Sequence, residues 1–153
     1  MREMWSDNYK VTSYLVDCRK ELSLFGLLSL IQEAAWEHAE ELGYGYAAML
    51  QKNLMWALIR QKMNIEWWPQ WGEGIRIRTW LRPLEGLLVS RDLEFWQEKG
   101  CFCRATALYL MLDHDRRHPA PAPMQAADFY GGERGAHDPQ KLPPLPGLPV
   151  LAR

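Results

Sequence analysis

The stretch SLFGLLSLIQEAAWEHAEEL, residues 23–42, decides the fold of this chain. Its apolar side chains recur every three or four residues, which is the spacing of one face of an α-helix. The predicted apolar stripe consists of Leu24, Leu27, Leu28, Ile31, Ala35, His38, Ala39 and Leu42. Ser23 is a suitable N-cap and Gly43 a suitable stop, so the sequence predicts one long, one-sided helix.

Segments of strand type lie on both sides of this helix. Residues 9–16 (YKVTSYLV) are rich in β-branched and aromatic side chains and predict a first strand. After the helix, alternation with period two predicts four more strands, at residues 53–68, 75–82, 88–97 and 101–113. Because short turns join antiparallel neighbours, we expect these last four strands to form a meander.

The order of strand, long helix and four strands predicts an α+β fold. A one-sided helix must bury its stripe, and the only predicted sheet is the place to bury it. We therefore expect a five-stranded antiparallel sheet curled around a central helix. A parallel βαβ arrangement is disfavoured, because only one helix is available to cross between strands.

The composition is that of a single globular domain. The chain has 153 residues, of which 48% are hydrophobic and 24% charged. The eight Trp could fill the core, line an apolar ligand site or form a subunit interface, and composition does not separate these. A net charge of −1 argues against a nucleic-acid partner bound through bulk charge.

The cysteines and the two ends of the chain suggest a location and a domain boundary. Three Cys without metal-ligand spacing predict reduced thiols, no metal and no cofactor. The first ten residues lack the apolar core of a signal peptide, and the chain has no run of about 18 apolar residues, so we expect a cytoplasmic protein without a membrane span. Residues 1–118 are predicted to form the domain, and the Pro- and Gly-rich residues 119–153 an extended tail.

Several motifs in this order resemble a known family. LLSLIQEAAWEHAEELGYG resembles the helix of the N-terminal hotdog half of plant and bacterial acyl-acyl-carrier-protein (acyl-ACP) thioesterases, and WALIRQKMNIEWWPQWGEGIRIRTWL resembles the strand pair that follows. SRDLEF and ATALYLMLDHDRRHPA resemble the last two strands, and KLPPLP the linker towards the second hotdog domain. The resemblance covers about residues 9–146 and implies a single hotdog domain that handles fatty acyl-ACP or acyl-CoA thioesters.

The resemblance also implies how such a chain would work. The two-domain enzymes carry their catalytic segment, of the type D-x-N-x-H-V-N-N, in the second hotdog half, and this chain ends where that half would begin. We therefore expect a homo-oligomer, a dimer or a tetramer, in which a second copy replaces that half. The alternative is a non-catalytic module that binds acyl groups or the carrier protein.

Two carboxylates are candidates for the catalytic base or nucleophile. Asp17 follows the first predicted strand, where related hotdog enzymes place a catalytic Asp, but Arg19 and Glu21 stand where the family pattern has Asn and His. Glu33, in the middle of the helix, matches the position from which another hotdog subgroup directs its carboxylate across the subunit boundary. The structural alternatives are a carboxylate that caps a turn, for Asp17, and an ordinary solvent-exposed glutamate, for Glu33.

Four residues are candidates for substrate binding. Gly26 would let a thioester carbonyl approach the backbone N–H groups at the helix N-terminus, or would allow close packing against a strand. Gln32 could orient water or the carbonyl, or make a structural hydrogen bond. Trp56 and Arg60 lie on the strand after the helix, and Arg60 belongs to a possible basic patch for acidic carrier protein or CoA phosphates, otherwise a solvated sheet face. That patch would comprise Arg60, Lys62, Arg76, Arg78 and Arg82.

Two further expectations concern histidine. His38 lies on the apolar stripe, where a satisfied core histidine is the more common outcome. Dehydratases of the hotdog fold place a His ahead of the helix, and no His precedes His38 in this chain, which disfavours that activity.

Overall fold

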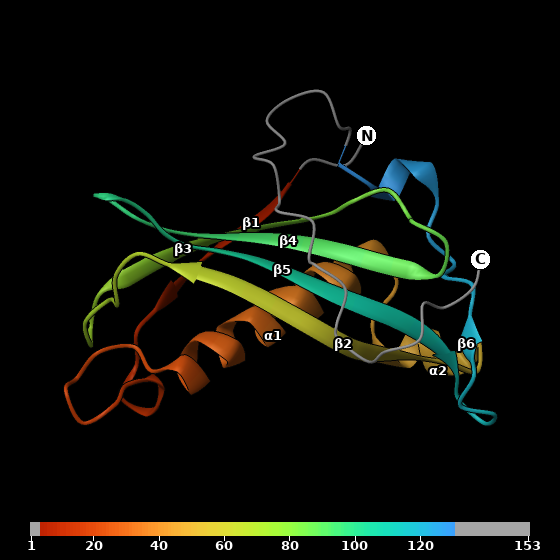
Figure 1. The fold of residues 1–153 in the computed structure, drawn as a ribbon, viewed down its shortest axis with the longest axis horizontal. Helices are drawn as coiled ribbons and strands as arrows, with labels where there is room; N and C mark the ends of the chain where they lie inside the picture. Colours follow the sequence, from red (N-terminus) through yellow and green to blue (C-terminus); the bar gives the residue numbers. More distant parts are fainter. Residues whose placement is uncertain (1–3, 131–153) are drawn as a thin grey trace.

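The computed structural model describes residues 4–130 and shows one long helix beneath a single antiparallel sheet (Figure 1). The helix α1 spans Leu24–Leu42 and the short helix α2 spans Tyr46–Gln51. The strands are β1 (Trp5–Lys10), β2 (Leu54–Ile65), β3 (Gly74–Leu81), β4 (Leu88–Gln97), β5 (Gly100–Asp113) and the two-residue β6 (Pro119–Ala120). The predicted α+β architecture, a helix packed against an antiparallel sheet, is confirmed.

The ends of α1 follow from its sequence. Ser23 Oγ accepts a hydrogen bond from the Gly26 amide at 2.9 Å, which satisfies one of the unpaired N–H groups of the first turn. Gly43 adopts a left-handed conformation with φ 85°, which glycine reaches without steric cost, and this ends the helix.

The buried face of α1 is rotated slightly from the predicted stripe. Leu24 is exposed and Leu28 only half-buried, whereas Leu30 and Ala34 are buried. The concave sheet encloses a wider arc of the helix than a flat surface would. Gly26, placed on the polar side by the helical pattern, is buried for a different reason: the segment before the helix folds back onto it at Leu15.

The strand order is β1-β3-β4-β5-β2, and every pairing is antiparallel. The predicted meander is therefore correct for β3, β4 and β5 and wrong for β2, which pairs with β5 rather than β3. Residues 66–73 connect β2 to β3, and β4 and β5 lie between these two strands in the sheet. A connection of only eight residues therefore does not join neighbouring strands here.

The predicted basic patch is wrong because of this strand order. Arg60 and Lys62 lie on β2, and Arg76 and Arg78 lie on β3, with β4 and β5 between them. Arg82 follows β3 and is engaged by Asp92 at 2.6 and 2.7 Å.

A β-bulge changes the alternation along β2. The register shifts between Leu58 and Arg60, so one extra residue stands opposite β5. As a result Trp56 and Met63 both pack against the core, although strict alternation along the strand assigned them to opposite faces.

The first strand and the second helix also differ from the prediction. β1 spans Trp5–Lys10, four residues earlier than expected, and Ser13–Leu15 forms a single 3-10 turn. The loop predicted after α1 contains α2, whose Met49 is fully buried. Short amphipathic helices like α2 give little periodic signal.

The residues after β5 lie against the sheet as far as the structure describes them. Pro119–Ala120 pairs with Met111 and Leu112, and the Tyr130 amide donates to the Leu81 carbonyl at 3.0 Å. The rest of the predicted tail, residues 131–153, lies outside the described residues, so the domain boundary at residue 118 stays a prediction.

We expect Gly26→Ala to destabilise the protein, because a Cβ at this position would collide with the Leu15 carbonyl oxygen. Overpacking of this kind costs about 1–3 kcal/mol and exceeds the gain in helix propensity, which is about 1 kcal/mol or less. Urea unfolding measures the loss. Gly74→Ala is the matched control: no atom lies within 4 Å of its Cβ position, and the change in stability should stay within about 0.5 kcal/mol. Equal losses in the two variants would contradict the packing argument.

Candidate functional site

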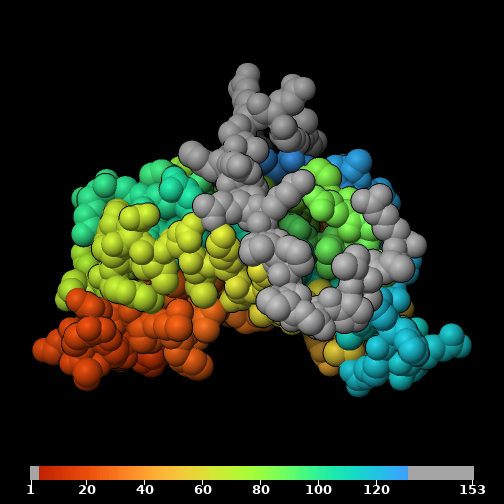
Figure 2. Space-filling model, viewed as in Figure 1, coloured from red at the N-terminus to blue at the C-terminus, as the bar shows by residue number. Residues whose placement is uncertain are grey.

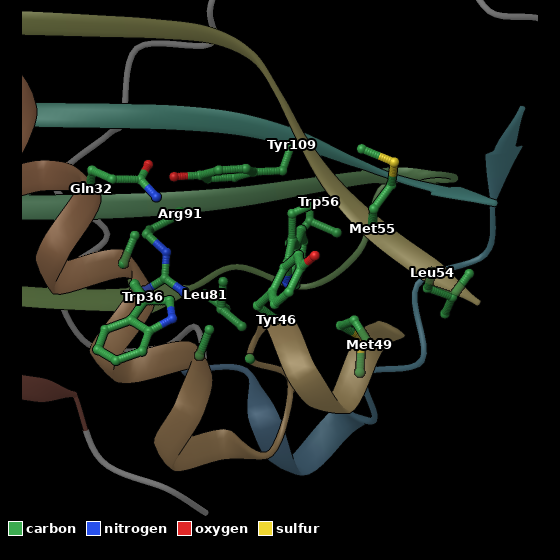
Figure 3. Close-up of a pocket in the computed structure, with 14 residues that line it drawn as sticks. Gln32, Trp36, Tyr46, Met49, Leu54, Met55, Trp56, Leu81, Arg91 and Tyr109 are labelled. Carbon is green, nitrogen blue, oxygen red and sulfur yellow. The ribbon is translucent and has the colours of Figure 1, made fainter. Parts of the chain in front are cut away.

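An apolar cavity of about 290 Å³ lies between the C-terminal half of α1, the helix α2 and the sheet (Figure 3). This volume is near the lower end of the range of small-molecule sites, roughly 300–1,000 Å³. Gln32 is the lining residue nearest the N-terminus of α1. With about 1.5 Å of rise per residue, it lies roughly 12 Å along the helix from Leu24, so the cavity is separate from the first turn of the helix. The cavity is lined by Gln32, Ala35, Trp36, Ala39, Gly45, Tyr46, Met49, Leu54, Met55, Trp56, Leu81, Val89, Arg91 and Tyr109.

Small residues on α1 create this cavity. Ala35 and Ala39 face the sheet where the N-terminal half of the helix presents Leu27 and Ile31. The shorter side chains leave room beneath the sheet, and α2 covers the open side with Met49. The mouth is edged by aromatic rings that remain partly in solvent, Trp36 at 48% and Tyr46 at 66% exposure.

Trp56 is held rigidly in the wall of the cavity. Its indole N–H donates to the Tyr44 carbonyl at 2.8 Å, and its ring meets the Tyr109 ring edge-on at 5.7 Å between centroids. An aromatic wall fixed in this way presents a flat apolar surface without further loss of side-chain freedom.

Besides Tyr46 at the mouth, the described lining includes the polar side chains of Gln32, Arg91 and Tyr109. Arg91 and Tyr109 are buried, whereas Gln32 lies at the exposed edge. In Figure 3 the Tyr109 hydroxyl is directed towards the Gln32 side chain. The Tyr109 hydroxyl is buried without a hydrogen-bond partner among the described residues, and burial raises the pKa of Tyr109, so the phenol stays neutral.

Arg91 reaches the cavity from the inner face of β4. Its Nη1 lies 2.7 Å from His38 Nδ1 and donates to Thr79 Oγ1 at 3.0 Å. Because a guanidinium only donates, His38 must accept through Nδ1, which is therefore unprotonated. His38 also stacks on Trp5 and is the satisfied core histidine that the apolar stripe predicted.

Two of the predicted site residues come together in this cavity, and four do not. Gln32 and Trp56 line it, whereas Asp17, Gly26, Glu33 and Arg60 lie elsewhere. Sequence reasoning did not select Tyr109, Arg91 or α2. The signal for Arg91 was present, since it shares its parity with Val89, Leu93 and Phe95, all of them buried.

Asp17 occupies a hydrogen-bonded turn between the 3-10 turn and α1. Its carboxylate accepts from the Arg19 amide at 2.9 Å, from the Arg19 guanidinium at 3.2 Å and from the Glu21 amide at 3.4 Å. Partial burial acts to raise the pKa of Asp17, but these hydrogen bonds outweigh it and lower the pKa below its ordinary value. Asp17 is thus an ionised carboxylate that organises a turn.

Glu33 lies on the exposed flank of α1, next to Gln32 in the sequence. The neighbouring side of the helix faces β1, where the Tyr9 hydroxyl donates to Glu37 at 3.0 Å. Burial, the hydrogen bond to Glu37 and the nearby carboxylates, Glu33 among them, raise the pKa of Tyr9. Glu33 is therefore close to β1 and open to solvent.

A long helix within one antiparallel sheet of this strand order, with a cavity between the two layers, defines a hotdog domain. The model of the acyl-ACP thioesterase N-terminal domain matches residues 2–130, and this chain belongs to that family, as the resemblance predicted.

Plant enzymes are among its relatives in sequence. The chain is 28% identical over 128 residues to a chloroplastic palmitoyl-acyl carrier protein thioesterase of Gossypium hirsutum, with 78% of this chain and 31% of that enzyme covered. It is 26% identical over 137 residues to the chloroplastic oleoyl-acyl carrier protein thioesterase 2 of Arabidopsis thaliana, with 82% and 36% covered. The chain thus spans about a third of the length of these relatives.

Solved structures share the fold. An acyl-ACP thioesterase from Bacteroides thetaiotaomicron superposes with a TM-score of 0.76 at 21% identity, over 82% of this chain and 52% of that one. The 12:0-ACP thioesterase from Umbellularia californica superposes with a TM-score of 0.75 at 22% identity, over 93% and 60%. A 1,4-dihydroxy-2-naphthoyl-CoA thioesterase from Synechocystis, matched over 90% of its chain at 13% identity, gives a TM-score of 0.71.

We expect Tyr109→Phe to stabilise the ligand-free protein by about 1 kcal/mol, because it removes a buried hydroxyl that lacks a partner. Tyr44→Phe is the matched control, since the Tyr44 hydroxyl donates to Asp128 at 2.6 Å and its loss should cost about 1–2 kcal/mol. Denaturant unfolding measures the change in the free energy of unfolding, which should rise in Tyr109→Phe and fall in Tyr44→Phe. A loss of stability in Tyr109→Phe would show that its hydroxyl is already satisfied.

Proposed function

We propose that this domain binds the acyl group in a thioester hydrolase that acts on fatty acyl-ACP or acyl-CoA. The observation that carries the proposal is the apolar cavity between α1, α2 and the sheet, in a chain of the acyl-ACP thioesterase family. Its lining of Ala, Val, Leu, Met and Trp side chains suits a hydrocarbon chain.

Hydrolysis further requires donors for the oxyanion and a base or nucleophile. The first turn of α1 is the proposed source of donors. There the Gly26 amide is already bonded to Ser23 Oγ, and the Leu27 amide to the Ser23 carbonyl. The amides of Leu24 and Phe25 precede these in the same turn, where the helix dipole favours negative charge. In this arrangement Gly26 contributes indirectly: because it lacks a side chain, the 3-10 turn can pack closely against the start of the helix.

Asp17 or Glu33 is the proposed catalytic carboxylate. Asp17 lies just before this first turn, and its low pKa keeps it ionised. Glu33 lies beside Gln32, which edges the cavity. With Glu33 as the base, Gln32 would orient the carbonyl or the attacking water; with Asp17 as the base, the carbonyl would lie at the first turn of α1, roughly 12 Å away. In either case Trp56 would pack on the acyl chain. Arg60, on the outer face of β2, would contact the carrier.

We also propose a homo-oligomer, a dimer or a tetramer. Two exposed surfaces support it. β2 is bonded on one side only within the described sheet, and Figure 2 shows its atoms (yellow) at the surface, where Leu58 and Ile59 are exposed. A long exposed edge with apolar side chains is a site for pairing with another chain.

The second surface surrounds the start of α1. Four side chains there are more than half exposed, up to 79% for Tyr14: Tyr14, Leu24, Phe25 and Trp71. Exposed aromatic groups of this size mark protein interfaces.

The proposed location is the cytoplasm. The three cysteines, Cys18, Cys101 and Cys103, are free thiols, as in a reducing compartment. None of the described helices is long and apolar enough to cross a membrane.

The second candidate function is a non-catalytic module that binds acyl groups or the carrier protein. It is favoured first by the position of the two carboxylates, since neither Asp17 nor Glu33 lines the cavity. The hydrogen bonds that hold Asp17 in its turn also suit a purely structural role.

The first test separates these two functions. Purified protein is assayed with medium- and long-chain acyl-ACP and acyl-CoA, beside Asp17→Asn and Glu33→Gln. Loss of a general base should lower turnover at least about 100-fold in one variant. Glu40→Gln, on the exposed face of the same helix, is the matched control and should keep its rate. Saturable acyl binding without turnover by the wild type would refute hydrolysis and support the binding module.

The second test concerns the cavity. Ala39→Leu adds three carbon atoms to its wall and should weaken binding of hexadecanoyl-CoA roughly 50-fold, at about 0.8 kcal/mol per excluded methylene, with octanoyl-CoA affected less. Ala47→Leu, on the exposed side of α2, makes the same change outside the cavity and should leave the dissociation constants unchanged. Equal effects of the two variants on both ligands would place the acyl chain elsewhere.

A further inference from the structure

The cavity wall carries a cation, Arg91, that forms no ion pair with the described residues, 4–130. Arg91 is 4% exposed, and β4 presents it on the same face as Val89 and Leu93, towards α1. The acidic residue next to it, Asp92, points to the other face of the sheet and forms a bidentate ion pair with Arg82. The nearest carboxylate in the sequence is therefore already engaged on the far side of the sheet.

The partners of the Arg91 guanidinium are neutral. Both of its hydrogen bonds among residues 4–130 use Nη1, to the His38 ring and to the Thr79 hydroxyl. Nε and Nη2 have no acceptor in this part of the chain. Burial lowers the pKa of Arg91 to about 10, and the opposing influence comes from Tyr109, not from a carboxylate. Arg91 is consequently a charged group at neutral pH.

A second, independent observation points to a missing ligand atom at the same place. The Tyr109 hydroxyl, also in the cavity wall, is buried without a partner among the described residues. Figure 3 shows it directed towards Gln32, whose amide adds further hydrogen-bonding capacity. A buried cation and a buried unpaired hydroxyl each cost stability, and one ligand oxygen group could satisfy both.

These features define the ligand by its chemistry. A guanidinium presents parallel N–H donors that match the two oxygens of a carboxylate, and a phenol can donate to the same group. The rest of the wall is hydrocarbon, from Ala35, Ala39, Met49 and Val89. A plain methyl-ended chain would fill the apolar part and leave the charge unpaired.

We propose that this cavity binds an aliphatic ligand that bears a carboxylate, with the carboxylate on the guanidinium of Arg91 and the hydroxyl of Tyr109. This inference rests on the proposed acyl-binding function and narrows its substrate class. The carboxylate has two possible sources. It belongs either to the far end of an acyl chain that is a thioester at its other end, or to a free fatty acid, the product of hydrolysis.

The test compares ligands that differ only in their polar group. Binding of dodecanoate, dodecanedioate and neutral 1-dodecanol to the wild-type protein is measured by calorimetry. A charge-assisted carboxylate pair should make the acids bind roughly 10- to 100-fold more tightly than the alcohol. Equal or tighter binding of 1-dodecanol would overturn the proposal, and this comparison needs no variant.

Two variants locate the carboxylate. Arg91→Met removes the charge and the hydrogen bonds to His38 and Thr79, and it keeps an unbranched apolar stem in part of the same space. It should abolish the preference for acids and leave 1-dodecanol binding intact. Tyr109→Phe should also weaken the binding of the two acids, by a smaller factor than Arg91→Met. An undiminished preference in Arg91→Met would overturn the assignment.

Thioester assays separate the two sources and the two proposals. Faster hydrolysis of the mono-CoA thioester of dodecanedioate than of dodecanoyl-CoA assigns the carboxylate to the substrate, whereas tight binding of free acids without this preference assigns it to the product. Hydrolysis of dodecanoyl-CoA without any preference for acids would leave the proposed function standing and reject this inference. Preferential acid binding without hydrolysis of either thioester would support this inference and reject the proposed hydrolysis.

Discussion

The structure depends on the burial of one helix face in the hollow of one sheet. Leu27, Ile31 and Ala34 of α1 are fully buried against inward-facing side chains such as Ile77 and Phe95. Removal of this apolar surface from water is the dominant favourable contribution to folding in a domain of this kind. The twist of the sheet, the cap at Ser23 and the close approach at Gly26 all serve this contact, since each sets how the helix lies against the strands.

The candidate site arises from a change along the same contact. In its first half α1 presents large side chains to the sheet, and in its second half it presents Ala35 and Ala39. These short side chains leave space beneath the sheet, and α2 covers its open side with Met49. One continuous packing surface therefore holds the fold together at one end and encloses a cavity at the other.

Strand alternation decides the electrostatics of the domain. Arg91 and Asp92 are neighbours in the sequence, but successive side chains of a strand point to opposite faces. Asp92 meets Arg82 at the outer surface of the sheet, whereas Arg91 enters the core with His38 and Thr79. A charge pair that a reader of the sequence would draw between the two residues does not form. On the outer face Asp92 and Arg82 neutralise each other, whereas on the inner face Arg91 has no carboxylate partner among residues 4–130.

The sequence by itself determined the helix, its two ends, the strand segments after it and the family. These features are local, since a repeat of three or four residues, a capping Ser and a Gly stop act within a few turns of the chain. The place of β2 beside β5, the bulge at Leu58/Arg60 and the helix α2 came only from the tertiary structure. The same holds for the cavity: two of its lining residues, Gln32 and Trp56, were among the candidates chosen from the sequence, but Arg91 and Tyr109 were not. The physical reason is that a cavity is the space left between elements distant in the chain, and no local pattern records which of them meet.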